Sequence, residues 1–183
     1  MFPLLDDRIF ESHEIPGPTK QEIRAIVLSK MRIFPGCKIL EIGTGTGSLT
    51  AEIERLGCYV VSIDIEDYIE RAPGRRITSY SDYIQASSEY FNCRQSQFNS
   101  VFIGGTKHLE QSVRLSRDLL TIEGRLVVNA FTIESIGNIG HVIQKYFGSY
   151  NVLQVQISVG ERRGDSTLMI ARNPIFIFYT TKT

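Results

Sequence analysis

The chain of 183 residues has few cysteines, no tryptophan and no excess of charge of either sign. Its three cysteines, Cys37, Cys58 and Cys93, are odd in number and lack CxxC spacing. That pattern argues against a disulfide framework and a metal site such as zinc, and it fits a reducing cytosol. Twenty lysines and arginines balance twenty aspartates and glutamates, so the composition predicts no nucleic-acid partner.

Long hydrophobic runs are also missing. The longest apolar runs have the length of a strand, well below the roughly 20 residues of a membrane helix, and residues 1–14 lack the apolar stretch of a signal peptide. Hydrophobic residues make up 42% of the chain and charged residues 22%, which is typical of a globular domain. We therefore expect a cytoplasmic protein that does not bind membranes, with a single domain over residues 1–183 and a lead-in over residues 1–18.

Strand-like and helix-like segments alternate along the chain. The expected strands are 38–42, 59–64, 77–80, 100–104, 124–130, 152–159 and 175–180, and the expected helices are 20–31, 48–56, 66–71, 82–90, 108–120 and 133–146. This alternation predicts an α/β fold with a parallel sheet covered on both faces. The last two strands have no helix between them, which predicts an antiparallel hairpin at one edge. Thr19 with Glu22 predicts a capping box at the first helix.

A glycine-rich turn, Glu41-Ile42-Gly43-Thr44-Gly45-Thr46-Gly47, follows the first expected strand and opens a helix. Glycines there allow a tight turn and let a ligand approach the main chain closely. Asp64 ends the next strand, where a carboxylate can accept both hydroxyls of a ribose. Because ligands of parallel sheets bind at the carboxyl ends of strands, these residues predict a site for a nucleoside-containing ligand.

Two ligand classes use this layout. A dinucleotide site requires G-x-G-x-x-G with the diphosphate at the helix N-terminus, whereas the spacing here is G-x-G-x-G and Ser48 takes the place of the third glycine. Glu41 adds negative charge, which suits the amino and sulfonium groups of S-adenosylmethionine better than a diphosphate. The methyl donor is therefore favoured, while a dinucleotide and a turn without any ligand remain alternatives.

The turn together with Asp64 resembles motifs one and two of class I methyltransferases. Four further segments resemble the decarboxylating cobalt-precorrin (carbon-15) methyltransferases of cobalamin (vitamin B12) synthesis, namely 15–19, 103–105, 124–130 and 171–174. The resemblance covers nearly the whole chain. It implies a Rossmann-like class I methyltransferase fold, with a mostly parallel seven-stranded sheet and an antiparallel C-terminal strand. It also implies that S-adenosylmethionine is the cofactor and that carbon 15 of a cobalt-precorrin is methylated with loss of an acetate carboxyl group.

The resemblance also implies a cofactor site. Backbone groups from Gly43 to Gly47 would hold the methionine part, and Asp64 would hold the ribose. Asp82 and Tyr83 would contact the adenine, and Thr19 would touch the ligand from the lead-in. Helix capping for Thr19 and a solvated helix start for Asp82 and Tyr83 remain alternatives. The segment between Asp64 and Asp82 is shorter than is usual in the family, so the resemblance does not fix which residues form the wall around the adenine.

A tetrapyrrole with many carboxylates requires cations at its binding cleft. The expected substrate-binding residues are Lys107, Arg162, Arg163 and Arg172, with solvated loop positions as the alternative for the first three. The apolar run Leu168-Met169-Ile170 lies in the same loop, and it favours a strand at a subunit contact. Because the family tends to assemble, we expect a homo-oligomer such as a tetramer. The catalytic residues are not identified, and no strong base is expected, because methyl transfer to an electron-rich ring carbon depends mainly on positioning and desolvation.

Two other functions stay open. A class I methyltransferase could act on RNA, protein or a small metabolite. The balanced charge argues against RNA, and the lack of an Asn/Asp-Pro-Pro-Tyr/Phe sequence after the fourth strand argues against methylation of base amino groups. A non-catalytic scaffold subunit that binds S-adenosylmethionine would keep the glycine turn without a substrate pocket.

Overall fold

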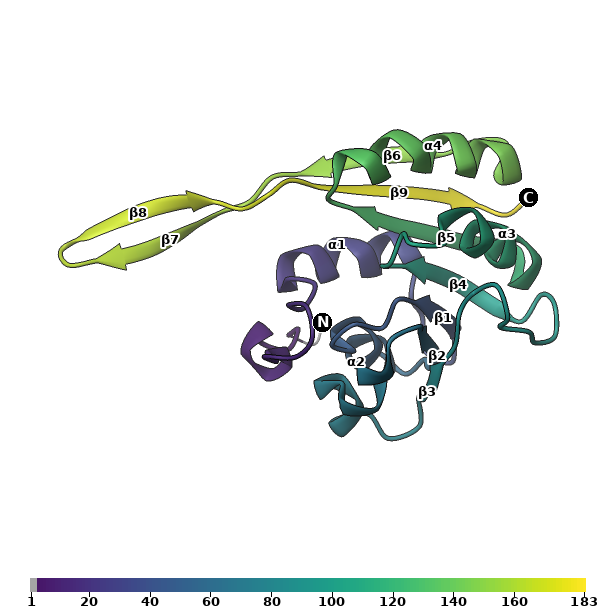
Figure 1. Ribbon diagram of the computed structural model, residues 1–183, viewed down its shortest axis with the longest axis horizontal. Coiled ribbons are helices and arrows are strands. Elements are labelled where there is room, and N and C mark those ends of the chain that lie inside the picture. Colours follow the sequence, from purple (N-terminus) through teal and green to yellow (C-terminus); the bar gives the residue numbers. More distant parts are fainter. Residues whose placement is uncertain (1–2) are drawn as a thin grey trace.

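A seven-stranded sheet forms the centre of the molecule (Figure 1), as seen in a computed structural model that describes residues 3–183. The strand order is β3-β2-β1-β4-β5-β9-β6. The strands are β1 (Lys38–Ile42), β2 (Tyr59–Asp64), β3 (Asp82–Gln85), β4 (Phe98–Ile103), β5 (Leu120–Ala130), β6 (Asn151–Val155) and β9 (Ile175–Thr181). All neighbours are parallel except β9, which runs antiparallel to both β5 and β6. The predicted sheet with its antiparallel C-terminal strand is confirmed.

Helices cover both faces of this sheet. The helices α1 (Gln21–Met31) and α2 (Ser48–Arg55) pack on one face, and α3 (Leu109–Leu119) and α4 (Ile133–Phe147) pack on the other. Three short 3₁₀ helices complete the set: η1 (Asp7–Phe10), η2 (Asp67–Arg71) and η3 (Pro73–Arg76). No helix among residues 3–183 is long and apolar enough to cross a membrane.

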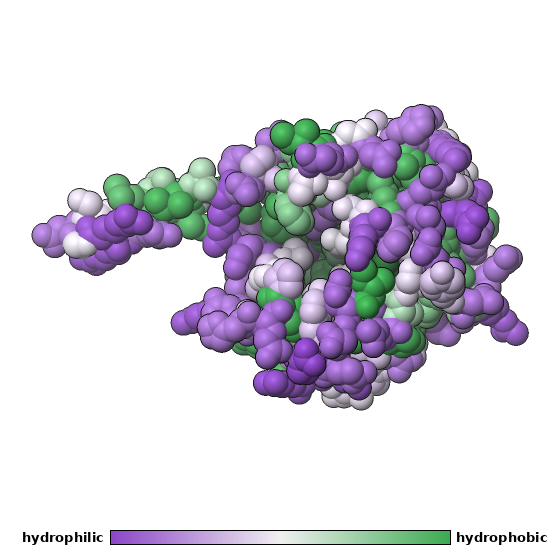
Figure 2. All heavy atoms as spheres, in the orientation of Figure 1, coloured by the Kyte–Doolittle hydropathy of each residue, from purple (hydrophilic) through white to green (hydrophobic). Residues whose placement is uncertain are grey.

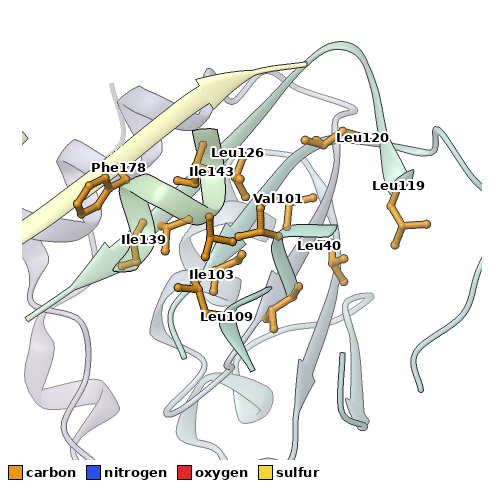
Figure 3. Packing of buried hydrophobic residues seen from close by; sticks show 14 of the residues in the cluster. Leu40, Val101, Ile103, Leu109, Leu119, Leu120, Leu126, Ile139, Ile143 and Phe178 are labelled. Atoms are coloured by element: carbon orange, nitrogen blue, oxygen red, sulfur yellow. The ribbon is translucent and has the colours of Figure 1, made fainter. Parts of the chain in front are cut away.

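Neighbouring residues of the central strands point to opposite faces, and each face has its own hydrophobic core. Ile39, Val60 and Ile177 pack with α1 and α2, whereas Leu40 and Val101 pack with α3 and α4. Figure 3 shows the second group, in which side chains of the strands meet Leu109 of α3 and Ile139 of α4. Burial on both faces explains why these strands are nearly continuous apolar runs.

The third strand differs from the prediction. The expected strand at 77–80 is not formed, and the expected helix at 82–90 is replaced by the strand β3 at residues 82–85. The carboxylate of Glu54 accepts hydrogen bonds from the amides of Ser79 (2.6 Å) and Ser81 (2.8 Å), which holds the preceding segment as a loop. The signal was weak because β3 is an edge strand with mostly exposed side chains.

A long arm replaces the last expected connection. The predicted strand 152–159 is two strands, β6 and β7 (Ser158–Arg163), and β7 pairs with β8 (Ser166–Ala171) in a separate antiparallel sheet. This arm extends away from the body (Figure 1), with hydrophobic side chains on its stem and a hydrophilic tip (Figure 2). The apolar run at 168–170 is a strand, as predicted, and it lies in the arm.

The lead-in is tied to the body by a buried arginine. The side chain of Arg24 on α1 is 0% exposed. Its Nη1 donates to Asp7 Oδ1 and to the Thr19 carbonyl, both at 2.7 Å, and its Nη2 lies 3.5 Å from Glu52 of α2. The predicted capping box is wrong: Lys20 is the N-cap of α1 and makes no side-chain cap bond. The chain stays extended through this cap, and the Thr19 carbonyl is used by Arg24.

The prediction from cysteine spacing is also corrected. Cys37 and Cys58 form a disulfide with their Cα atoms 4.6 Å apart, while Cys93 is free. The two residues directly precede β1 and β2, whose register pairs Lys38 with Tyr59. Neighbouring parallel strands therefore bring the cysteines together although they are 21 residues apart in sequence.

Candidate functional site

The glycine turn connects β1 to α2 in a backbone conformation that side chains rarely adopt. Gly43, Gly45 and Gly47 have φ values of +91°, +52° and +70°. A Cβ atom on Gly43 would lie 2.6 Å from the amide nitrogen of Gly105, just after β4. The turn is thus packed against the end of the neighbouring strand, and only glycine fits at position 43.

A cavity of about 390 Å³ lies at this turn, and we call it the glycine-turn cavity. It is at the carboxyl ends of β1, β2 and β4, where the sequence predicted a ligand. The predicted residues that line it are Thr19, Glu41, Gly43, Thr44, Gly45, Thr46, Asp64 and Lys107. Gly47 lies outside the lining and packs against Gly74 of η3.

Glu41 gives this cavity a buried carboxyl group. Its side chain is 1% exposed and accepts hydrogen bonds at Oε2 from the hydroxyls of Thr50 and, at 3.1 Å, Ser62. The pKa of Glu41 is raised to about 8, mainly by burial and in smaller part by the charge of Asp64, while the hydrogen bonds from the two hydroxyls lower it. A cationic ligand in the cavity would therefore favour the ionised form of Glu41.

Asp64 lies at the end of β2, as predicted, and is 8% exposed. Its Oδ2 accepts from the amide of Gly45 at 3.0 Å and its Oδ1 from the amide of Glu66 at 3.1 Å. Each oxygen has a second acceptor site. The carboxylate is thus held in place by the main chain with capacity left for two further donors, as the two hydroxyls of a ribose require.

One hydroxyl in the turn has no partner in the protein. Thr44 shares a hydrogen bond of 2.8 Å with Ser62, but the buried Oγ1 of Thr46 has none among the described residues. A buried polar atom without a partner is rare. Because Thr46 lines the cavity, a ligand with polar groups fits this place.

The two residues expected to contact adenine lie elsewhere. Asp82 and Tyr83 are inside β3 rather than after it, and neither lines the glycine-turn cavity. Asp82 accepts a hydrogen bond from Tyr59, while the ring of Tyr83 packs under Gly47. Burial raises the pKa of the Tyr83 hydroxyl. The adenine contact of these residues stays a prediction.

Two residues directly after β3 line the cavity instead, and sequence reasoning missed them. These are Ala86 and Ser88. The amide of Ala86 donates to the Asp64 carbonyl at 2.8 Å, and the Ser88 hydroxyl accepts from Ser112 of α3 at 2.9 Å. They were missed because the sequence placed the third strand at 77–80, five residues before its actual position at 82–85.

A second cavity of about 470 Å³ adjoins the first, and we call it the Asn129 cavity. It lies between α1, the ends of β4 and β5, and the segments that lead into and out of the arm. The two cavities share a wall that consists of Gly17, Thr19, Phe102, Gly104 and Phe131. Thr19 is therefore placed at both cavities, which its predicted role did not include.

The four expected substrate cations are not brought together. Arg172 lines the Asn129 cavity and pairs with Glu22 at 3.3 Å, whereas Lys107 lines the glycine-turn cavity. Arg162 and Arg163 lie on β7 in the arm, exposed and away from both cavities. Among residues 3–183, no group of three histidine, cysteine, aspartate or glutamate side chains could hold a metal ion.

Sequence reasoning also missed Lys20 and Asn129, which line the second cavity. Lys20 directly follows Thr19 and lies 3.8 Å from Asp7. Asn129 is a polar residue at the end of the apolar strand β5. A polar residue in such a run was the available signal, because buried strands rarely carry an amide without a purpose.

The comparisons with known proteins agree with this geometry. The family model described as "Precorrin methyltransferase domain" matches residues 15–182. A relative from Saccharolobus solfataricus, named "Probable cobalt-precorrin-6B C(15)-methyltransferase (decarboxylating)", is 32% identical over 97% of this chain and 94% of its own length. A relative of the same name from Thermoplasma acidophilum is 31% identical over 94% of this chain and 90% of its own length.

Solved structures share the fold. The crystal structure of precorrin 8w decarboxylase from Methanobacterium thermoautotrophicum matches with a TM-score of 0.89 at 23% identity, covering 97% of this chain and 99% of that chain. A tRNA (m1A58) methyltransferase from Aquifex aeolicus matches with a TM-score of 0.82 at 14% identity, covering 99% of this chain and 77% of that chain. The fold is that of the class I methyltransferases.

Proposed function

This chain belongs to the precorrin methyltransferase family, and we propose that it methylates carbon 15 of a cobalt-precorrin from S-adenosylmethionine. The same reaction removes an acetate carboxyl group, as part of cobalamin biosynthesis in the cytoplasm, and one domain over residues 1–183 carries it out. The observation that carries the proposal is the glycine-turn cavity, in which Glu41, the free Thr46 hydroxyl and Asp64 line one space. The names of the curated relatives support the substrate.

Different residues of the glycine-turn cavity bind different parts of the cofactor. The turn from Gly43 to Thr46 and the carboxylate of Glu41 hold the methionine part, whose amino group is cationic. Asp64 holds the ribose hydroxyls, in the position that Gly45 and Glu66 already fix. Ala86 and Ser88 form the wall of the cavity that contacts the adenine. The ring of Tyr83 packs against Gly47 and so supports the turn.

Bound S-adenosylmethionine supplies a methyl group on a sulfonium centre. The protein needs no strong base for this transfer, because charge disperses as the methyl group moves to a carbon nucleophile. Thr19, Phe102 and Phe131 stand between the two cavities, where they exclude water and align the acceptor with the donor. Loss of carbon dioxide leaves its electron pair in the conjugated ring, which then takes up a proton.

The arm supports the expected homo-oligomer. Leu168 and Met169 of β8 are 45% and 67% exposed although they are large and apolar. Exposed apolar side chains on an arm that extends away from the body fit a contact with another protein chain. We propose that the arm packs against other copies of the chain, and that Arg162 and Arg163 reach the substrate of a neighbouring copy.

Calorimetric titration with S-adenosylhomocysteine tests the cofactor site. The wild-type protein should bind it, and Asp64→Ala and Asp64→Asn should weaken binding at least about 10- to 100-fold, because the loss of even one charge-assisted hydrogen bond costs about 1.5–3 kcal/mol. Asp67→Ala is the matched control, since the side chain of Asp67 is 79% exposed and does not line the cavity.

Two other outcomes would contradict the proposed cofactor or the proposed substrate. Heat with a nicotinamide dinucleotide but none with S-adenosylhomocysteine would mean that the glycine turn binds a dinucleotide. Binding of S-adenosylhomocysteine without turnover of a cobalt-precorrin would favour a methyltransferase for another substrate or a non-catalytic subunit.

A further inference from the structure

The Asn129 cavity is lined by an asparagine whose buried amide oxygen has no hydrogen-bond partner among residues 3–183. Asn129 is the second-last residue of β5 and is 9% exposed. Its main chain is in register with Ile177 of β9, so the strand pairing fixes where the side chain begins. The Oδ1 atom is buried and accepts no hydrogen bond from any described residue. Such an atom costs stability unless a ligand supplies the donor.

The lining of the Asn129 cavity combines apolar and cationic side chains. Phe102, Ile175 and Ile23 line the cavity together with Asn129. Lys20 and Arg172 line it as well, and neither carboxylate that pairs with them, Asp7 or Glu22, does. The cavity wall itself therefore carries two positive charges and no negative one.

Both cations can turn toward a ligand with little loss of protein stability. The pair of Arg172 with Glu22 joins side chains that are 35% and 46% exposed, and the Lys20 side chain is 39% exposed. Ion pairs at such exposed positions contribute little to stability. A carboxylate that enters the cavity can therefore recruit either cation without breaking a strong contact.

We propose that the Asn129 cavity binds the acceptor molecule as a flat apolar ring with carboxyl groups at its edge. This inference rests on the proposed function and adds the place and the chemistry of the acceptor site. The ring edge lies against the apolar wall, and Lys20 and Arg172 bind its carboxylates. An amide offers an acceptor and an N–H donor in one plane, which matches the O–H and C=O of a carboxyl group that the apolar wall keeps protonated. Asn129 is thus a specificity-determining residue of this site.

The acceptor site at the Asn129 cavity does not include the arm. Arg162 and Arg163 are not needed for the first contact with the acceptor, because the wall of the Asn129 cavity already supplies two cations from the same chain. The shared wall at Thr19 and Phe102 places this acceptor site directly beside the cofactor site.

Fluorescence titration with uroporphyrin, a flat tetrapyrrole with eight carboxyl groups, tests the site without turnover. The wild-type protein should bind it with the cofactor site filled by S-adenosylhomocysteine. Asn129→Asp has nearly the same shape but removes the N–H donor and places a negative charge near the carboxylates that Lys20 and Arg172 bind, and it should weaken uroporphyrin binding more than about 10-fold. Arg172→Gln should weaken it about 3- to 5-fold. Both variants should keep the wild-type affinity for S-adenosylhomocysteine, which also shows that they are folded.

Asn138→Asp is the matched control, because Asn138 is exposed on α4 and lines neither cavity. If Asn129→Asp does not fold, Asn129→Ser removes the amide without adding charge and should weaken binding about 5-fold. Wild-type affinity for uroporphyrin in the Asn129 variants, or no uroporphyrin binding by the wild-type protein, would overturn the inference. Neither result would affect the proposed cofactor site, which fails only if S-adenosylhomocysteine does not bind.

Discussion

The two cavities share a wall but have opposite charge. The glycine-turn cavity is lined by the carboxyl groups of Glu41 and Asp64, and the Asn129 cavity by the cations Lys20 and Arg172. A sulfonium donor is cationic and a precorrin carries many carboxylates, so each of the proposed ligands finds the opposite charge. The arrangement also disfavours binding of either ligand in the wrong cavity, because the ligand would there face charge of its own sign. A chain with zero net charge thus separates its charges locally.

The first test removes the buried side chain of Arg24, which binds the Thr19 carbonyl in the wall that the two cavities share. Arg24→Met leaves the carboxylates of Asp7 and Glu52 without their buried partner, so the free energy of unfolding should fall by about 3–5 kcal/mol. The Thr19 carbonyl also loses its 2.7 Å hydrogen bond, so affinity for S-adenosylhomocysteine should fall as well. Urea unfolding and calorimetry measure the two effects.

Arg8→Met is the control for Arg24→Met. Arg8 also pairs with an aspartate, but its side chain is 82% exposed, and such exposed pairs contribute little to stability. A stable Arg24→Met protein with unchanged affinity would mean that the lead-in is held by other contacts and that the wall does not depend on Arg24.

The second test destabilises the protein at the opposite end of the sheet. Cys37 and Cys58 precede β1 and β2, whereas both cavities lie at the carboxyl ends of the strands. Reduction should lower the free energy of unfolding by about 3 kcal/mol for a loop of this length. Ligand affinity should not change. Unfolding curves with and without a reductant measure this, and a Cys37→Ala, Cys58→Ala double variant should not respond to the reductant. A change in affinity on reduction would contradict the separation.

The third test concerns the ionisation of Glu41 in the glycine-turn cavity. The pKa of Glu41 is about 8 in the folded protein and near 4.5 when the chain is unfolded. Between these values only the folded state holds the proton, so the contribution of Glu41 to stability is complete below about pH 4.5 and is lost as the pH rises to 8. The expected slope is about 1.4 kcal/mol per pH unit.

Glu41→Gln should remove this slope, because the amide does not titrate and still accepts from Thr50 and Ser62. Urea unfolding of both proteins at pH 6, 7 and 8 measures the difference. Parallel curves would show that the carboxyl group is ionised in the folded protein across this range. The wild-type protein should also release protons when it binds S-adenosylhomocysteine at pH 7, and Glu41→Gln should not.

The sequence predicted the acidic cavity much better than the basic one. Gly43 directly follows one strong apolar strand and Asp64 ends another, so their positions depend on local pattern alone. Lys20, Asn129 and Arg172 come from three distant parts of the chain, and they meet at one cavity because β9 pairs with β5 and α1 packs against both strands. Spacing carries no information about such contacts, which also explains the disulfide that was not predicted.

Lys107 is the exception to the division of charge, and it gives the test with the smallest expected effect. The sequence suggested that it binds a substrate carboxylate, yet it lines the acidic cavity. A cation there can pair with the carboxylate of the methionine part of the cofactor. Because Lys107 is exposed, the pair should contribute less than about 1 kcal/mol, so Lys107→Gln should lower affinity for S-adenosylhomocysteine about 2- to 5-fold. Affinity for 5′-methylthioadenosine, which lacks that carboxylate, should not change. Equal losses for both ligands would show that Lys107 acts on the nucleoside end, and an effect on uroporphyrin alone would return it to the acceptor side of the wall.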